Sequence, residues 1–372
     1  MRIPFNIPYM PIESKNYLLQ ALDGNYQNSD AYFTMKASEE ISKLVGGGHV
    51  LLTPSCTHAL ELASMLINLS PGDEVILPSY TFTSAAIAVT KFGATPVFVD
   101  IDLETKCIDL NTVSALVTNK TKAISWVNYA GNAPEMEIIA KIANAFDLFL
   151  IEDNAHSLGA KYKGKPLGSF GDFATQSFHS SKNIQCGEGG ALIINNSKFI
   201  DRARIIRDKG TNRSKFLEGK VEKYKWVDHG SSYLLAEYLA AILLGQLENF
   251  EQIQDIRKGI YSKYIEKLSI PKGVRRIGDN SNIYHMLSIE FTSKALLNNF
   301  EKGMKNFNIS TATHYEPLHL SPMGQKYKSN IPKNSISQQV ANTLTRMPLY
   351  PDLLNFDLKK IIDQTNSVLN EI

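Results

Sequence analysis

The chain has 372 residues, of which 43% are hydrophobic and 20% are charged, and its formal net charge at pH 7 is +2. This composition excludes a disordered chain and a protein that coats nucleic acid, and the length exceeds what one hydrophobic core usually fills. Three cysteines without metal-binding or disulfide spacing, and an N-terminus without the apolar run of a signal peptide, favour a cytoplasmic protein with no structural metal site.

Short apolar runs recur between residues 50 and 195 and predict a sheet of seven strands. The first five runs are separated by segments long enough for helices, at 57–68, 82–92, 109–118 and 134–146. Strands that alternate with helices form a mainly parallel sheet, whereas the two loop-like links that follow, 152–172 and 179–190, allow one strand to run antiparallel. The predicted strands are residues 50–53, 74–77, 96–99, 123–128, 148–151, 173–178 and 191–194.

The remainder of the chain predicts a smaller α+β domain. Apolar residues at helical spacing predict a helix at 197–208 and a long helix at about 233–268 that bridges two domains. Further on, the sequence predicts strands at 284–291 and 308–315 and helices at 293–306, 335–345 and 356–370. We expect a large α/β domain with an N-terminal arm at residues 1–245 and a small C-terminal domain at 246–372.

Two polar segments follow predicted strands and carry residues typical of cofactor chemistry. Glu152 and Asp153 come directly after the strand at 148–151, and Lys182 follows the strand at 173–178. Open α/β sheets bind ligands at the carboxyl ends of their strands, so these side chains are expected to face one crevice. A lysine amine forms an imine with an aldehyde cofactor, and a buried aspartate keeps a pyridine nitrogen protonated.

A third segment follows the first strand. Thr53, Ser55 and Thr57 lie in a turn of small residues that leads into a helix, and free N–H groups at a helix start bind phosphate. Taken alone, an ordinary N-cap by Ser55 or Thr57 explains this segment better. Phe82, taken alone, is typical of core packing, although an aromatic side chain also stacks on a flat ring.

Together, the segments at 55–57, 78–82, 152–156 and 177–183 resemble the DegT/StrS sugar aminotransferases, which are pyridoxal 5'-phosphate enzymes of fold type I. The resemblance implies that Lys182 forms the imine with the cofactor, that Asp153 pairs with its pyridine nitrogen, and that Phe82 stacks on its ring. It also implies that His156 lies near the phenolic oxygen. The full set that the resemblance assigns to the cofactor is Ser55, Cys56, Thr57, His58, Phe82, Asp153, His156, Ser177 and Lys182.

Within this family, the segments at 209–213, 223–226, 230–233 and 314–319 resemble the dTDP-4-amino-4,6-dideoxygalactose transaminases of surface polysaccharide synthesis. That branch converts dTDP-4-keto-6-deoxy-D-glucose and L-glutamate to dTDP-4-amino-4,6-dideoxy-D-galactose and 2-oxoglutarate. The resemblance implies a homodimer with shared active sites. Leu234 stands where many members place an asparagine that reaches the partner's phosphate group, and Ser232 or Arg213 are candidates to replace it. Candidate substrate contacts are Arg213, Tyr233, His314 and His319.

Two alternatives stay open at this point. One is an aminotransferase that acts at C3 or C4 of another nucleotide-linked keto-sugar. Another is a regulatory protein that binds pyridoxal phosphate, although no DNA-binding module is evident in the sequence. Two other functions are disfavoured. A sugar dehydratase is disfavoured because relatives with that activity carry histidine where this chain has Lys182, and a dinucleotide-binding dehydrogenase because no GxGxxG motif follows the first strand.

Overall fold

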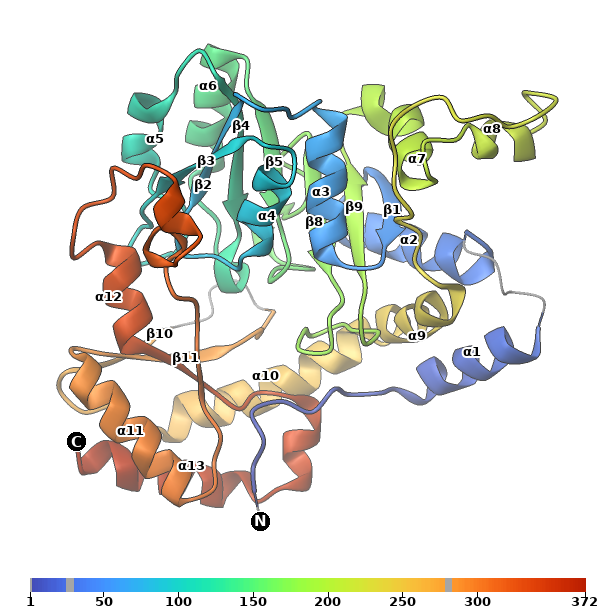
Figure 1. Cartoon of the computed structure of the whole chain (residues 1–372). Helices are drawn as coiled ribbons and strands as arrows, with labels where there is room; N and C mark the ends of the chain where they lie inside the picture. Colours follow the sequence, from blue (N-terminus) through green and yellow to red (C-terminus); the bar gives the residue numbers. More distant parts are fainter. Residues whose placement is uncertain (1, 25–29, 278–282) are drawn as a thin grey trace.

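The computed structural model describes residues 2–24, 30–277 and 283–372. A seven-stranded sheet in the order β1-β9-β8-β5-β4-β2-β3 forms the larger part, and a four-stranded sheet lies in a second part beside both termini (Figure 1). Six strands of the large sheet are parallel, and β9 is antiparallel to both of its neighbours, which confirms the predicted architecture. The large-sheet strands are β1 (His49–Thr53), β2 (Glu74–Pro78), β3 (Thr95–Val99), β4 (Thr121–Val127), β5 (Phe149–Asp153), β8 (Phe173–Ser177) and β9 (Gly190–Ile194).

Helices bury both faces of this sheet. Leu51 and Ile151 face a core formed with α3, α4 and α7, while their sequence neighbours Leu52 and Leu150 face the opposite side, which α2, α9, α5 and α6 cover. Most of these strands contain an apolar run because both of their faces are buried, and these runs made the strands predictable. The helices of this part are α1 (Ile12–Asp23), α2 (Tyr32–Leu44), α3 (Cys56–Leu66), α4 (Ser84–Thr90), α5 (Leu110–Leu116), α6 (Met136–Phe146), α7 (Ile200–Arg207), α8 (Arg213–Leu217) and α9 (Glu237–Glu248).

The second part packs an antiparallel sheet, in the order β10-β11-β13-β12, against helices. Tyr264, Ile289 and Phe300 belong to its core, and Ile3 from the N-terminal segment joins them and pairs with Ile309. Its elements are α10 (Phe250–Lys267), β10 (Val274–Ile277), β11 (Leu287–Phe291), α11 (Lys294–Asn306), β12 (Ala312–Thr313), α12 (Ile336–Thr343), β13 (Leu344–Met347) and α13 (Leu358–Asn370).

Short elements complete the chain. They are the hairpin of β6 (Lys161–Tyr162) and β7 (Lys165–Pro166) and the 3-10 helices η1 (Tyr129–Gly131), η2 (Ser197–Phe199), η3 (Leu318–Leu320), η4 (Gly324–Lys326) and η5 (Pro351–Asn355). Within the described ranges, no helix is long and apolar enough to cross a membrane.

Three predicted elements are wrong in type or extent. The single helix expected at 233–268 is two helices, because α9 ends at Glu248 and is capped by Asn249, whose side-chain amide donates to the carbonyl of Gly245 at 2.8 Å. The helix expected at 335–345 stops at Thr343, and β13 follows immediately. The strand expected at 308–315 shrinks to the two residues of β12. The expected domain boundary between residues 245 and 246 stays a prediction.

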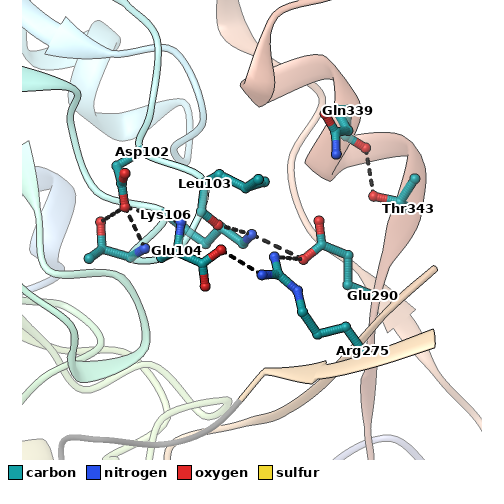
Figure 2. A network of polar contacts seen from close by, with 9 residues as sticks. Asp102, Leu103, Glu104, Lys106, Arg275, Glu290, Gln339 and Thr343 are labelled. Carbon is teal, nitrogen blue, oxygen red and sulfur yellow. Dashed lines mark hydrogen bonds and ion pairs between the residues drawn. The ribbon is translucent and has the colours of Figure 1, made fainter. Parts of the chain in front are cut away.

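An ion-pair network with a buried Lys106–Glu290 pair at its centre joins the loop after β3 to the second sheet (Figure 2). The ammonium of Lys106 lies 3.1 Å from a carboxylate oxygen of Glu290 on β11, and the same oxygen accepts from Arg275 on β10 at 2.7 Å. Arg275 also contacts Glu104 at 2.6 Å. Asp102 holds the turn by accepting from the backbone N–H of Thr105 at 2.8 Å. These contacts fix the two parts of the chain relative to each other, and the crevice between them contains the site described next.

Candidate active site

A cavity of about 570 Å³ lies at the carboxyl ends of the parallel strands. Val127, Asp153 and Ser177, which end β4, β5 and β8, line one wall, while the second part contributes Met286 and Arg346. Its volume suits a cofactor together with a small substrate. A crevice at the carboxyl ends of the strands is where open α/β sheets bind ligands.

Asp153 is the last residue of β5 and lies at the base of this cavity. Its side chain is buried and accepts a hydrogen bond from the backbone N–H of Ala155 at 3.1 Å. Burial raises the pKa of Asp153 above its ordinary value, while the Lys182 charge acts in the opposite direction. Among the described residues, no cation lies within ion-pair distance of this carboxylate, so a cationic ligand group would stabilise it.

Lys182 lies in the loop that leaves β8. The loop folds back on itself, because the N–H of Lys182 donates to the carbonyl of His179 at 2.9 Å and that of Ser180 to Gly187 at 2.9 Å. Burial lowers the pKa of Lys182 to about 8, and the neighbouring Cys56 and Asp153 only partly oppose this effect. Asp153 and Lys182 thus line one cavity and act on each other electrostatically.

The start of α3 forms a second polar region of the cavity wall. Ser55 caps the helix by accepting from the N–H of His58 at 3.2 Å, and the hydroxyls of Thr57 and Ser84 lie 2.6 Å apart. Gly190 packs so closely that a Cβ on it would lie 2.3 Å from the carbonyl carbon of Ser55. Free N–H groups and small hydroxyls at a helix start suit a phosphate group.

His156 and two aromatic residues form the wall between these regions and the second part. The Nε2 atom of His156 lies 3.2 Å from the hydroxyl of Tyr315, whereas its buried Nδ1 has no hydrogen-bond partner among the described residues. Burial, followed by the charge of Lys182, lowers the pKa of His156 well below its usual value, so the ring is neutral. Phe82, which is 59% exposed, lines the cavity beside Tyr315.

These observations fit pyridoxal phosphate. The unpaired carboxylate of Asp153 suits its ring nitrogen, the unpartnered Nδ1 of His156 suits its phenolic oxygen, and the start of α3 suits its phosphate. The residues predicted for the cofactor that line this cavity are Ser55, Cys56, Thr57, Phe82, Asp153, His156, Ser177 and Lys182, and the predicted substrate contact His314 lines it too.

Two other predicted residues lie just behind the wall. The ring of His58 is hydrogen-bonded to the Ser55 hydroxyl at 3.1 Å, and Tyr233 is buried with its hydroxyl donating to Glu61 at 2.8 Å. Their rings are 5.1 Å apart. In this chain they support the start of α3 and do not line the cavity.

Arg213 and His319 also lie away from the cavity lining. Arg213 begins α8 and is 3.5 Å from Asp208, and His319 is bonded through Nδ1 to the hydroxyl of Ser79 at 2.6 Å. The geometry of the single chain thus gives neither residue a contact with substrate, and both assignments stay predictions.

The structure adds lining residues that the sequence analysis did not single out. His285 precedes β11 and is held by Asn183 at 2.9 Å, and Arg346 lies on β13. Arg346 is the one charged residue in an apolar run, Leu344 to Tyr350, and this isolation was the signal available in the sequence. Phe5 of the N-terminal segment lies against its guanidinium.

The chain is similar in sequence and in fold to known proteins. The DegT/DnrJ/EryC1/StrS aminotransferase family matches residues 10–366. An uncharacterized protein of Methanocaldococcus jannaschii is 32% identical over 350 residues, which cover 91% of this chain and 90% of that one. GDP-perosamine synthase of Escherichia coli O157:H7 is 30% identical over 371 residues, with 99% of each chain covered. The pyridoxal phosphate form of a putative sugar aminotransferase, Spr1654 from Streptococcus pneumoniae, has a TM-score of 0.89 at 23% identity and covers 100% and 99% of the two chains.

Proposed function

Because the chain belongs to the DegT/DnrJ/EryC1/StrS aminotransferase family of pyridoxal phosphate-dependent sugar aminotransferases, we propose that it aminates dTDP-4-keto-6-deoxy-D-glucose. The amino donor is L-glutamate, and the products are dTDP-4-amino-4,6-dideoxy-D-galactose and 2-oxoglutarate. The observation that carries the aminotransferase chemistry is the cavity shared by Lys182 and Asp153 at the carboxyl edge of the sheet. The choice of sugar rests on the resemblance of the segments at 209–213 and 314–319.

The residues of the cavity have different roles in the proposed reaction. When bound, pyridoxal phosphate supplies an electrophilic aldehyde and a ring that accepts electrons. Asp153 would hold the ring nitrogen, and because burial raises the pKa of this carboxyl, a cationic N–H is the partner that stabilises its charge. His156 and the start of α3 would hold the phenolic oxygen and the phosphate.

Lys182 supplies the mobile proton. An amine with the ordinary lysine pKa would be almost fully protonated at neutral pH and a poor base. The pKa of Lys182, lowered to about 8 by burial, allows Nζ both to accept and to release a proton near neutral pH. Its place on the cavity wall lets it serve the donor and the sugar in turn, because both substrates use the same cavity.

A second candidate keeps the reaction and changes the nucleotide. The 30% identity with GDP-perosamine synthase over 99% of both chains favours a GDP-linked 4-keto-sugar as the alternative substrate. In the test, purified enzyme is incubated with glutamate and, in separate reactions, with a dTDP-, a GDP- or a UDP-linked keto-sugar. Mass spectrometry and NMR of the product identify the sugar, the carbon and the configuration. Turnover of only a GDP- or UDP-linked sugar would overturn the dTDP assignment.

We also propose a cytoplasmic homodimer with shared active sites. Phe82 at the cavity wall is 59% exposed and Trp226 is 77% exposed, and a second subunit would cover such apolar surface. Leu234 cannot supply the polar contact that an asparagine would make with a partner's phosphate group. Sedimentation at several concentrations gives the oligomeric state, and a monomer with full activity would contradict shared sites.

A further inference from the structure

We propose that Arg346 binds the α-carboxylate of the amino-acid donor. This inference rests on the proposed function, because it assigns a ligand group within the same cavity. Arg346 lies on β13, on the wall formed by the second part of the chain, and so faces the cavity from a different element than Lys182 and Asp153.

The contacts of Arg346 leave its charge uncompensated. Its Nε donates to the carbonyl of Ala312 at 3.3 Å and one Nη to the carbonyl of Thr313 at 3.1 Å, while its guanidinium lies 4.8 Å from the ring centre of Phe5. Carbonyls and an aromatic ring orient a guanidinium but carry no negative charge. Among the described residues, no carboxylate lies within ion-pair distance of it. A half-buried cation that lines a cavity without an anion is poorly compensated, so an anionic ligand group would stabilise this arrangement.

The position of Arg346 suits a carboxylate that sits next to a reacting amine. Arg346 and Lys182 line the same cavity, and the charge of Arg346 helps to lower the pKa of Lys182. In an α-amino acid, one carbon separates the amine from the carboxylate, so the cation that holds the carboxylate must lie near the group that handles the amine. The planar fork of arginine binds a carboxylate through two parallel hydrogen bonds.

A nucleotide diphosphate fits this part of the cavity less well. The groups that Arg346 contacts, which are the ring of Phe5 and the carbonyls of Ala312 and Thr313, carry no charge. Arg257 also lines the cavity, but it is buried and donates to the carbonyls of Tyr284 and His285. A diphosphate calls for several cations, whereas one carboxylate needs a single guanidinium.

The first experiment measures binding without turnover. Glutarate, which has carboxylates but no amine, is titrated calorimetrically into the cofactor-loaded enzyme. Arg346→Gln should weaken binding about 10- to 100-fold, as expected for the loss of a charged hydrogen-bonded pair. Arg276→Gln is the matched control, because Arg276 bonds the carbonyl of Ile265 outside the cavity and its loss changes the net charge equally. Equal weakening in both variants would overturn the proposal.

The second experiment changes the amino donor, so no contact within the protein is lost. Wild-type enzyme is mixed in single turnover with glutamate or with isoglutamine, whose α-carboxylate is an uncharged amide. The efficiency should fall about 10- to 100-fold with isoglutamine in the wild type, and Arg346→Gln should scarcely distinguish the two donors. A wild-type enzyme that uses both donors equally well would refute the assignment, even if the Arg346 variants fold poorly.

The two half-reactions separate this inference from the proposed function. If Arg346 holds the donor, Arg346→Gln slows amination of the cofactor by glutamate and leaves the half-reaction with the keto-sugar near the wild-type rate. A slowed sugar half-reaction alone would assign Arg346 to the nucleotide and refute the proposal. If wild-type cofactor absorbance responds to no amino acid, the proposed function itself fails, whatever the glutarate titration gives.

Discussion

Glu290 is the residue whose replacement should weaken the junction between the two parts of the chain most. Its side chain is 6% exposed and that of Lys106 is fully buried, with 3.1 Å between ammonium and carboxylate (Figure 2). Glu290→Gln leaves the Lys106 ammonium with uncharged acceptors, which are the carbonyl of Leu103 and the amide oxygen of the new glutamine. Removing one partner of a buried ion pair costs about 3–5 kcal/mol. We expect about 3 kcal/mol, the lower end of that range, because glutamine retains an acceptor oxygen.

A matched control separates buried charge from charge in general. Glu104 contacts the same Arg275 at 2.6 Å, but its side chain is 73% exposed, so Glu104→Gln should cost less than about 1 kcal/mol. Urea unfolding of the wild type and the two variants gives the midpoint of each transition. The slope of the unfolding free energy against urea concentration converts the differences between midpoints to free energies. Equal costs for the two variants, or a Glu290→Gln protein as stable as the wild type, would refute the reasoning.

Three further predictions concern the cavity. Lys182→Ala should abolish turnover and the visible absorbance of the bound cofactor, and a yellow, fully active variant would refute the role of this amine. Asp153→Asn should fold normally, checked by circular dichroism, yet lose at least about 100-fold in rate, because an amide cannot hold a cationic ring nitrogen; an unimpaired variant would contradict that assignment. Capture of pyridoxal phosphate by the cofactor-free chain should speed up with rising pH and level off above about 8, since the lowered pKa of Lys182 leaves about one-tenth of the amine neutral at pH 7; continued acceleration to pH 10 would show an ordinary lysine pKa.

The sequence predicted the large sheet well and the second part less well, for a physical reason. Strands such as β5 are buried on both faces and contain an apolar run, residues 149–151 in β5, so composition alone revealed them. β10 contains Arg275, which forms ion pairs with Glu104 and Glu290, and β13 contains Arg346, which lines the cavity, so the sequences of these strands lack an apolar pattern. The break at Asn249 depends on contacts of its side chain with Gly245 and Glu13. No local pattern in the sequence reveals such contacts.

Some residues of the site could likewise be predicted from the sequence and others could not. Asp153, Lys182 and the start of α3 lie at strand ends, where the fold class dictates the location of ligands, so they could be named in advance. Arg346 could not, because its role depends on β13 crossing to the other wall of the cavity. Tyr233 belongs to the segment at 230–233 whose resemblance suggested a substrate contact, yet its hydroxyl donates to buried Glu61. The resemblance of a segment therefore did not distinguish residues that line the cavity from residues that pack behind them.

The central claim is that the amine of Lys182 and the carboxylate of Asp153 enclose one cofactor. The most direct test is borohydride reduction of the holoenzyme, which fixes the cofactor on the amine that holds it, followed by digestion and peptide mass spectrometry. We predict a single phosphopyridoxyl group on the peptide that contains Lys182. A label on another lysine, or no label on a protein that retains its activity, would contradict the account.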